Sequence, residues 1–149
     1  MSRLGTVYVT QAHFDVELGI LRQIWRRLQK VRAAMADLRS KDAYRPASRT
    51  TERAQLTNGL EWNLSREHDI CMEFLKRNAP FYPREIRQLA TETLTITVSE
   101  RKEVLGEGPQ FTEEWYAAGR KRLDEFDIKL SQLEDSMRVR IAALATTSR

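Results

Sequence analysis

A seven-residue recurrence of apolar side chains near the start of the chain is the feature that most limits its fold. One series between about Gln11 and Arg39 repeats every seven residues, and a second series lies between its members (Phe14, Leu21, Leu28 and Met35; Ile24, Val31 and Leu38). The segment contains no proline and only one glycine, Gly19. Apolar residues at this spacing share one face of an α-helix, which other helices must then cover. We therefore predict a long amphipathic helix over residues 11–39.

The C-terminal part of the chain repeats this pattern after a Gly-Glu-Gly-Pro break at 106–109. Thr112, followed by two glutamates, is typical of a helix N-cap with an acidic first turn. We expect this helix to continue to about Ala145. The candidate helix-packing seam combines the heptad positions of both long helices (Leu21, Leu28, Met35, Leu123, Leu130 and Met137). As in coiled coils, such seams pack against a partner helix within one chain or between two chains.

Two shorter helices are predicted between the long ones. Thr50 or Thr51 provides an N-cap for a helix that extends to about Asn78. Pro83 suits the first position of the helix that follows.

The segment 84–105 fits two kinds of structure. Its apolar side chains recur every four positions, as a helix requires, yet residues 93–99 also alternate between hydroxyl-bearing and aliphatic side chains. A strand there would pair with residues 6–10 in a short β-ribbon, which is marginal unless it packs on helices. We favour the helix. The expected fold is an all-α, elongated four-helix bundle in which residues 1–149 form a single domain.

Positive charge is concentrated in the N-terminal part of the chain. Residues 1–53 hold 11 Lys and Arg against 5 Asp and Glu, whereas the other 96 residues hold 14 against 16. Five basic residues of the first predicted helix form a candidate contact set for an acidic partner or a nucleic acid (Arg22, Arg26, Arg27, Lys30 and Arg32). Trp25, which we assign first to the core, borders this set and could stack on a base. A solvated helix face would carry the same charges, so both interpretations stay open.

Few residues suited to chemistry are present. The chain has one cysteine and two histidines, and it contains no glycine-rich phosphate-binding motif and no serine-nucleophile elbow. Neither His13 nor His68 follows a glutamate by three positions, as the ligands of di-iron bundles do. Cys71 falls on an apolar helix face, where a buried structural thiol is expected. We therefore expect no catalytic residue, no metal, no cofactor and no small-molecule substrate.

These patterns favour a non-enzymatic interaction or adaptor protein that self-associates as a homo-oligomer or docks on a helix of a protein partner. The alternative is a helical bundle that binds nucleic acid through the basic face of the first predicted helix. The first fifteen residues lack the apolar run of a signal peptide, and no segment approaches the ~20 apolar residues of a membrane span. With its single cysteine, the chain is expected to be intracellular, in the cytoplasm.

Overall fold

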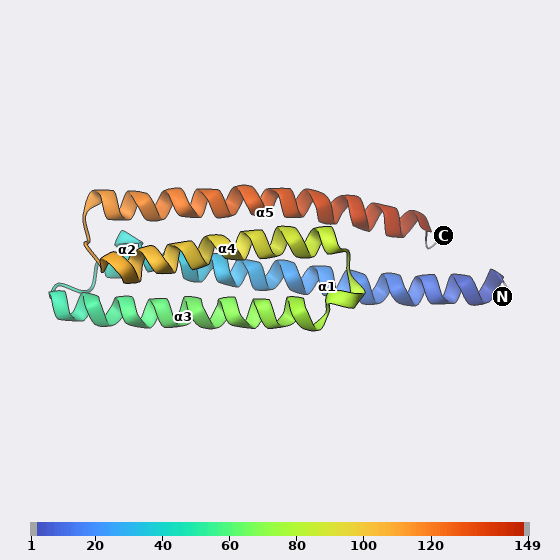
Figure 1. Ribbon diagram of the computed structural model, residues 1–149, viewed down its shortest axis with the longest axis horizontal. Coiled ribbons are helices and arrows are strands. Elements are labelled where there is room, and N and C mark those ends of the chain that lie inside the picture. The colour runs from blue at the N-terminus through green and yellow to red at the C-terminus, as the bar shows by residue number, and fades with distance from the viewer. Residues whose placement is uncertain (1–2, 148–149) are drawn as a thin grey trace.

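A computed structural model describes the backbone of residues 3–147 and the side chains of residues 11–146. Four long helices run alternately up and down an elongated bundle (Figure 1): α1 Arg3–Leu38, α3 Thr50–Arg77, α4 Arg84–Glu107 and α5 Glu113–Thr147. A short helix, α2 (Lys41–Tyr44), and a 3-10 turn, η1 (Ala79–Phe81), lie in the connections. The all-α fold class and the four-helix bundle are thereby confirmed.

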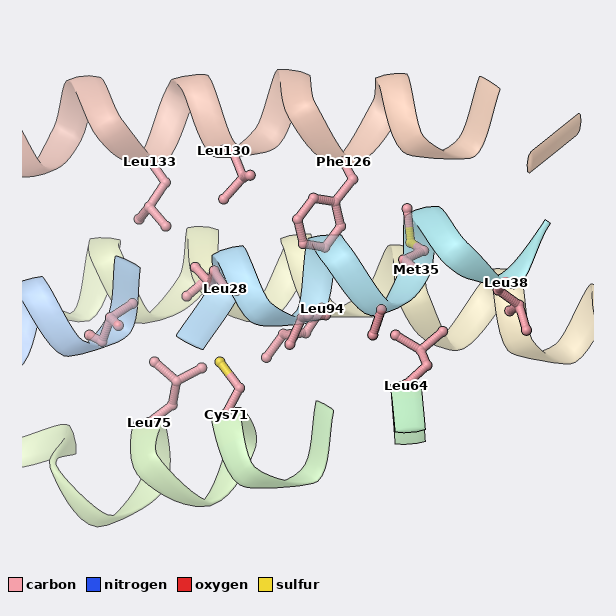
Figure 2. Packing of buried hydrophobic residues seen from close by; sticks show 14 of the residues in the cluster. Leu28, Met35, Leu38, Leu64, Cys71, Leu75, Leu94, Phe126, Leu130 and Leu133 are labelled. Atoms are coloured by element: carbon pink, nitrogen blue, oxygen red, sulfur yellow. The ribbon is translucent and has the colours of Figure 1, made fainter. Parts of the chain in front are cut away.

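The core lies along the axis of the bundle, where the apolar faces of the long helices meet. Both α1 and α4 lie beside α3 and α5. Figure 2 shows Leu28, Leu64, Leu94 and Leu133, one from each long helix, within this core, and none of them is more than 1% exposed. Figure 1 also shows that the start of α1 and the end of α5 run past the connection between α3 and α4. Within the described residues, no helix combines the length and apolar character needed to cross a membrane.

The segment that also resembled a strand is helical throughout. Its buried positions follow one helix face of α4 (Ile86, Ala90, Thr93, Leu94 and Thr97). The hydroxyl groups of Thr93 and Thr97 donate to the carbonyl oxygens of Leu89 and Leu94, at 2.7 and 2.6 Å. Because these bonds satisfy the hydroxyls inside the helix, threonine is tolerated at buried positions. Residues 6–10 also lie in a helix, α1, so the alternative of a β-ribbon between the two segments was wrong.

The helix ends agree only partly with the predicted caps. Thr112 caps α5 as expected, because its Oγ1 accepts a hydrogen bond from the backbone N–H of Trp115 at 3.1 Å. The N-cap of α3 is instead Arg49, with Thr50 already helical, so the predicted threonine cap was wrong. Pro83 occupies the N-cap of α4 rather than its first helical position.

An aromatic cluster closes the end of the bundle where α1 leads into α2 and α4 leads into α5 (Tyr44, Phe111, Trp115 and Tyr116). Ring centroids of the contacting pairs are 5.0 to 5.8 Å apart, as is typical of edge-to-face packing. Tyr44 is 1% exposed, and its hydroxyl donates to the carbonyl oxygen of Leu38 at 2.8 Å. The connection after α1 and the connection between α4 and α5 therefore pack into one aromatic cluster.

Candidate interaction groove between α1 and α5

The structure divides the five predicted basic residues of α1 into two groups. Arg22, Arg26 and Lys30 are exposed and form no ion pair with a described side chain. Because they lie one turn apart along the outer side of α1, they present an unneutralised row of positive charge. These three residues remain available to contact a partner.

The other two arginines of that set are engaged within the bundle. Arg27 faces α3, where its guanidinium carbon lies 4.8 Å from the centroid of the Phe74 ring. Arg32 reaches α5 and donates two hydrogen bonds to the Asp127 carboxylate, at 2.5 and 2.8 Å. The Asp127 pair raises the pKa of the Arg32 guanidinium, which therefore stays charged. Their first role is to hold neighbouring helices together.

The predicted packing seam lies inside the bundle. Leu123 is half-buried, and the other members are buried (Leu21, Leu28, Met35, Leu130 and Met137). Figure 2 shows Leu28, Met35 and Leu130 among the core side chains. The heptad series of α1 and α5 therefore have partners within the chain.

An open hollow of about 410 Å³ lies where the middle of α1 meets the last part of α5. We call it the Trp25 hollow, and its lining combines apolar and charged side chains (Leu21, Trp25, Met137 and Ile141; Arg22, Arg26, Arg138 and Glu134). Glu134 forms an ion pair with Arg138, one turn away on α5. Arg22 and Arg26 are thus the unpaired charges beside an apolar wall.

On the α5 side of this hollow, the sequence predicted only Met137, as a member of the helix-packing seam. The residues of this side recur at helical spacing and share one face of α5 (Glu134, Met137, Arg138 and Ile141). That spacing was available as a signal, but periodicity alone does not say which neighbouring helix a face will meet. Only the packing places Arg138 opposite Arg22 and Arg26.

A second hollow of about 430 Å³ lies at the other end of the same helix pair. We call it the Gly119 hollow, and α1, α5 and the residues after α1 line it (Met35, Ala36, Arg39, Ser40, Lys41, Asp42, Gly119, Arg120 and Leu123). A Cβ atom added at Gly119 would lie 2.6 Å from the Cβ of Arg39, which is closer than such atoms approach in proteins. Glycine is therefore needed at this point for α5 to approach α1.

Arg39 belongs to a buried charged cluster behind the Gly119 hollow. The side chain is nearly inaccessible, its Nη2 lies 2.5 Å from Glu100 Oε1, and its Nη1 donates to the Trp115 carbonyl at 3.2 Å. Glu103 and Arg122 pair beside it and join α4 to α5. Glu100 Oε2 and Arg39 Nε have no hydrogen-bond partner among the described atoms. Burial raises the pKa of Glu100, and the nearby guanidinium groups only partly oppose this shift.

A second buried carboxylate lies toward the opposite end of the bundle. Glu17 is 1% exposed and accepts two hydrogen bonds from Arg140 of α5, at 2.7 and 3.0 Å. His13 Nε2 lies 3.3 Å from the same carboxylate. This arrangement ties α1 to α5 and leaves the carboxylate fully engaged, so we assign it a structural role.

The described side chains contain no group of three or more His, Cys, Asp and Glu residues placed to hold a metal ion. Burial raises the pKa of the Cys71 thiol to about 12, so the reactive thiolate is not formed at neutral pH. The two hollows between α1 and α5 are open and lined by exposed charged side chains, so they are the candidate binding features.

No family model, no curated protein and no solved structure matches this chain.

Proposed function

We propose that this chain is a non-enzymatic interaction protein whose α1–α5 face binds an acidic amphipathic helix of a partner protein. The observation that carries the proposal is the Trp25 hollow, where an apolar wall borders two arginines without acidic partners. An amphipathic helix would cover that wall with its apolar face. Its carboxylates would then reach Arg22 and Arg26, and charge complementarity would orient it.

A second copy of this chain suits the Trp25 hollow less well than an acidic partner does. In a two-fold dimer through this face, the same surface would meet itself. The lining carries three arginines and one glutamate, so two copies of this face would bring together an excess of positive charge, which opposes association. The charge of the rim therefore favours a different protein with acidic residues.

Nucleic acid is the alternative occupant, because Arg22, Arg26 and Lys30 are unpaired and evenly spaced. Lys30 distinguishes the two cases, since it is exposed but does not line the Trp25 hollow. Lys30→Glu should weaken the binding of a nucleic acid that contacts the exposed row of Arg22, Arg26 and Lys30. The same change should have little effect on a helix seated between α1 and α5.

The test uses a fluorescein-labelled synthetic helix of about 18 residues, ~27 Å long, with leucines on one face and glutamates on the other. We expect Arg22→Glu with Arg26→Glu to weaken its binding at least about tenfold, because like charges would then face each other. The matched control is Arg66→Glu with Arg84→Glu, which makes the same charge change at exposed positions of α3 and α4.

Two further probes define the contrary outcomes. A scrambled peptide of the same composition, whose leucines do not share a face, should bind weakly. A single-stranded oligonucleotide should also bind weakly. Equal binding of both peptides, or equal losses in the two charge-reversal variants, would contradict the proposal. Tighter binding of the oligonucleotide, lost in Lys30→Glu, would instead support the nucleic-acid alternative.

A further inference from the structure

The two hollows lie on one continuous line between the same antiparallel helices. The Trp25 hollow is lined by residues 21–26 of α1 and 134–141 of α5, and the Gly119 hollow by 35–42 and 119–123. In an antiparallel pair, residue numbers rise along one helix as they fall along the other, so the two hollows follow one another along the α1–α5 junction, which we call the groove. From Arg22 to Leu38, the last residue of α1, this junction is ~24 Å long, or about four and a half helical turns.

One ion pair crosses the groove between these stations. Arg32 and Asp127 fall between the two lining ranges on their respective helices, and they form two hydrogen bonds across the junction. Their side chains are 36% and 41% exposed, so the pair lies toward the outer side rather than in the core. Asp127 holds Arg32 through two hydrogen bonds, but solvent reaches both side chains, so a partner carboxylate that offers Arg32 the same two hydrogen bonds can replace Asp127 at a small net cost.

Basic residues border the groove on both sides of this ion pair. Arg22, Arg26 and Arg138 lie at the Trp25 hollow, whereas the Gly119 hollow adds the exposed residues Lys41 and Arg120. Arg138 pairs with Glu134 and Lys41 pairs with Glu113, and Asp42 pairs with Arg45, so Arg22, Arg26 and Arg120 carry the charge that no described acid neutralises. The groove as a whole thus offers an excess of positive charge over a length that matches a helix of several turns.

We infer that the partner helix spans both hollows and that one of its carboxylates takes Arg32 from Asp127 as it docks. This inference rests on the proposed function, because it specifies the occupant of the same face. Asp127 holds Arg32 in the free protein and repels an acidic helix once Arg32 has changed partners. Asp127 therefore competes for Arg32 with a carboxylate of a long acidic helix. A short helix that binds only in the Trp25 hollow does not reach this ion pair.

The experiment compares the labelled peptide of about 18 residues with a stapled acidic helix of about nine residues, ~14 Å long, which covers one hollow only. Asp127→Asn keeps the size of the side chain and removes its charge. We expect this variant to bind the long peptide about threefold to fivefold more tightly and the short peptide unchanged. Arg32→Gln should weaken the binding of the long peptide and leave the binding of the short peptide unchanged. Asp69→Asn, an exposed change on α3, controls for the net charge.

Each outcome separates this inference from the function on which it rests. If the wild type binds both peptides but Asp127→Asn has no effect, or the same effect on both, the spanning arrangement is wrong and the proposed function stands. If neither peptide binds the wild type, both are wrong. Thermal unfolding followed by circular dichroism establishes that each variant is folded before binding is compared.

Discussion

Arg22 lies in α1 and Arg39 directly follows its last residue, and each lines one of the two hollows between α1 and α5, yet their surroundings differ completely. Arg39 is 5% exposed and bonded to Glu100, which α4 supplies, whereas Arg22 is exposed and unpaired among the described side chains. The difference lies in the neighbouring helices, since α4 places a carboxylate beside one arginine and α5 places apolar residues beside the other. An arginine with a buried partner stabilises the bundle, and one beside a bare apolar wall is available for binding.

The largest effect should follow from removing the buried arginine. Arg39→Met leaves Glu100 charged and without its closest partner, and we expect it to lower the free energy of unfolding by about 3 to 5 kcal/mol. Urea denaturation measures the loss. Arg26→Met is the control at the exposed end and should change stability by less than about 0.5 kcal/mol. Similar losses in the two variants would abolish the distinction between them.

Replacing Arg140 tests the second buried carboxylate, Glu17, and should lower the free energy of unfolding by a smaller amount. Its side chain is 37% exposed, and His13 remains 3.3 Å from Glu17 after the change. We expect Arg140→Met to cost about 2 to 3 kcal/mol in the same denaturation experiment. A loss as large as that of Arg39→Met would show that exposure does not set the difference.

Gly119 tests the close approach of α1 and α5. A Cβ there would meet the Cβ of Arg39 at 2.6 Å, so Gly119→Ala must shift either α5 or the turn that holds Arg39. Overpacking outweighs the gain in helix propensity, and we expect a net loss of about 1 to 2 kcal/mol. Gly59→Ala is the matched control, because nothing lies within 4 Å of its added Cβ. That variant should be slightly more stable than the wild type, and a similar loss in both would argue against the steric explanation.

The smallest effect concerns pH and the Glu100 carboxyl. Its pKa is raised in the folded state by burial, so the folded protein holds this proton more tightly than the unfolded chain does. The group therefore reduces stability at neutral pH, and the reduction fades as pH falls toward its ordinary pKa of 4.5.

Glu100→Gln isolates this contribution from the carboxyls whose pKa values are lowered, such as Glu103. The ion pairs of Glu103 with Arg122 and Arg39 outweigh its burial, and its contribution is lost as pH falls. The stability of the wild type relative to Glu100→Gln should therefore increase between about pH 7 and pH 5. A constant difference between the two proteins would contradict the assigned cause.

The sequence predicted most of the helices because their apolar spacing is strong and local. Residues 93–99 were ambiguous, since alternating threonines fit a strand until Thr93 and Thr97 are seen to bond back to their own helix. The cap at Arg49 was missed because two threonines next to it offered a better side chain. Local patterns decide the type of an element more reliably than its ends.

The candidate site was only half visible in the sequence. The basic row of α1 is local and was found, but the partners of Arg32 and Arg39 are 95 and 61 positions away. Charge spacing cannot tell an arginine that will be buried from one that stays exposed. Apart from the seam residue Met137, the α5 wall of the Trp25 hollow was missed for the same reason, because it depends on which helices become neighbours.

The most direct test of the account is a map of backbone amide chemical shifts as the long acidic peptide is added to the isotope-labelled protein. We predict that the changes concentrate on the linings of the two hollows, at residues 21–26 and 134–141 of the Trp25 hollow and at residues 35–42 and 119–123 of the Gly119 hollow. The outer side of α3 around Trp62, which also exposes a large apolar side chain, should remain unchanged. Changes centred on α3, or spread evenly over the surface, would contradict the assignment of the α1–α5 groove as the binding face.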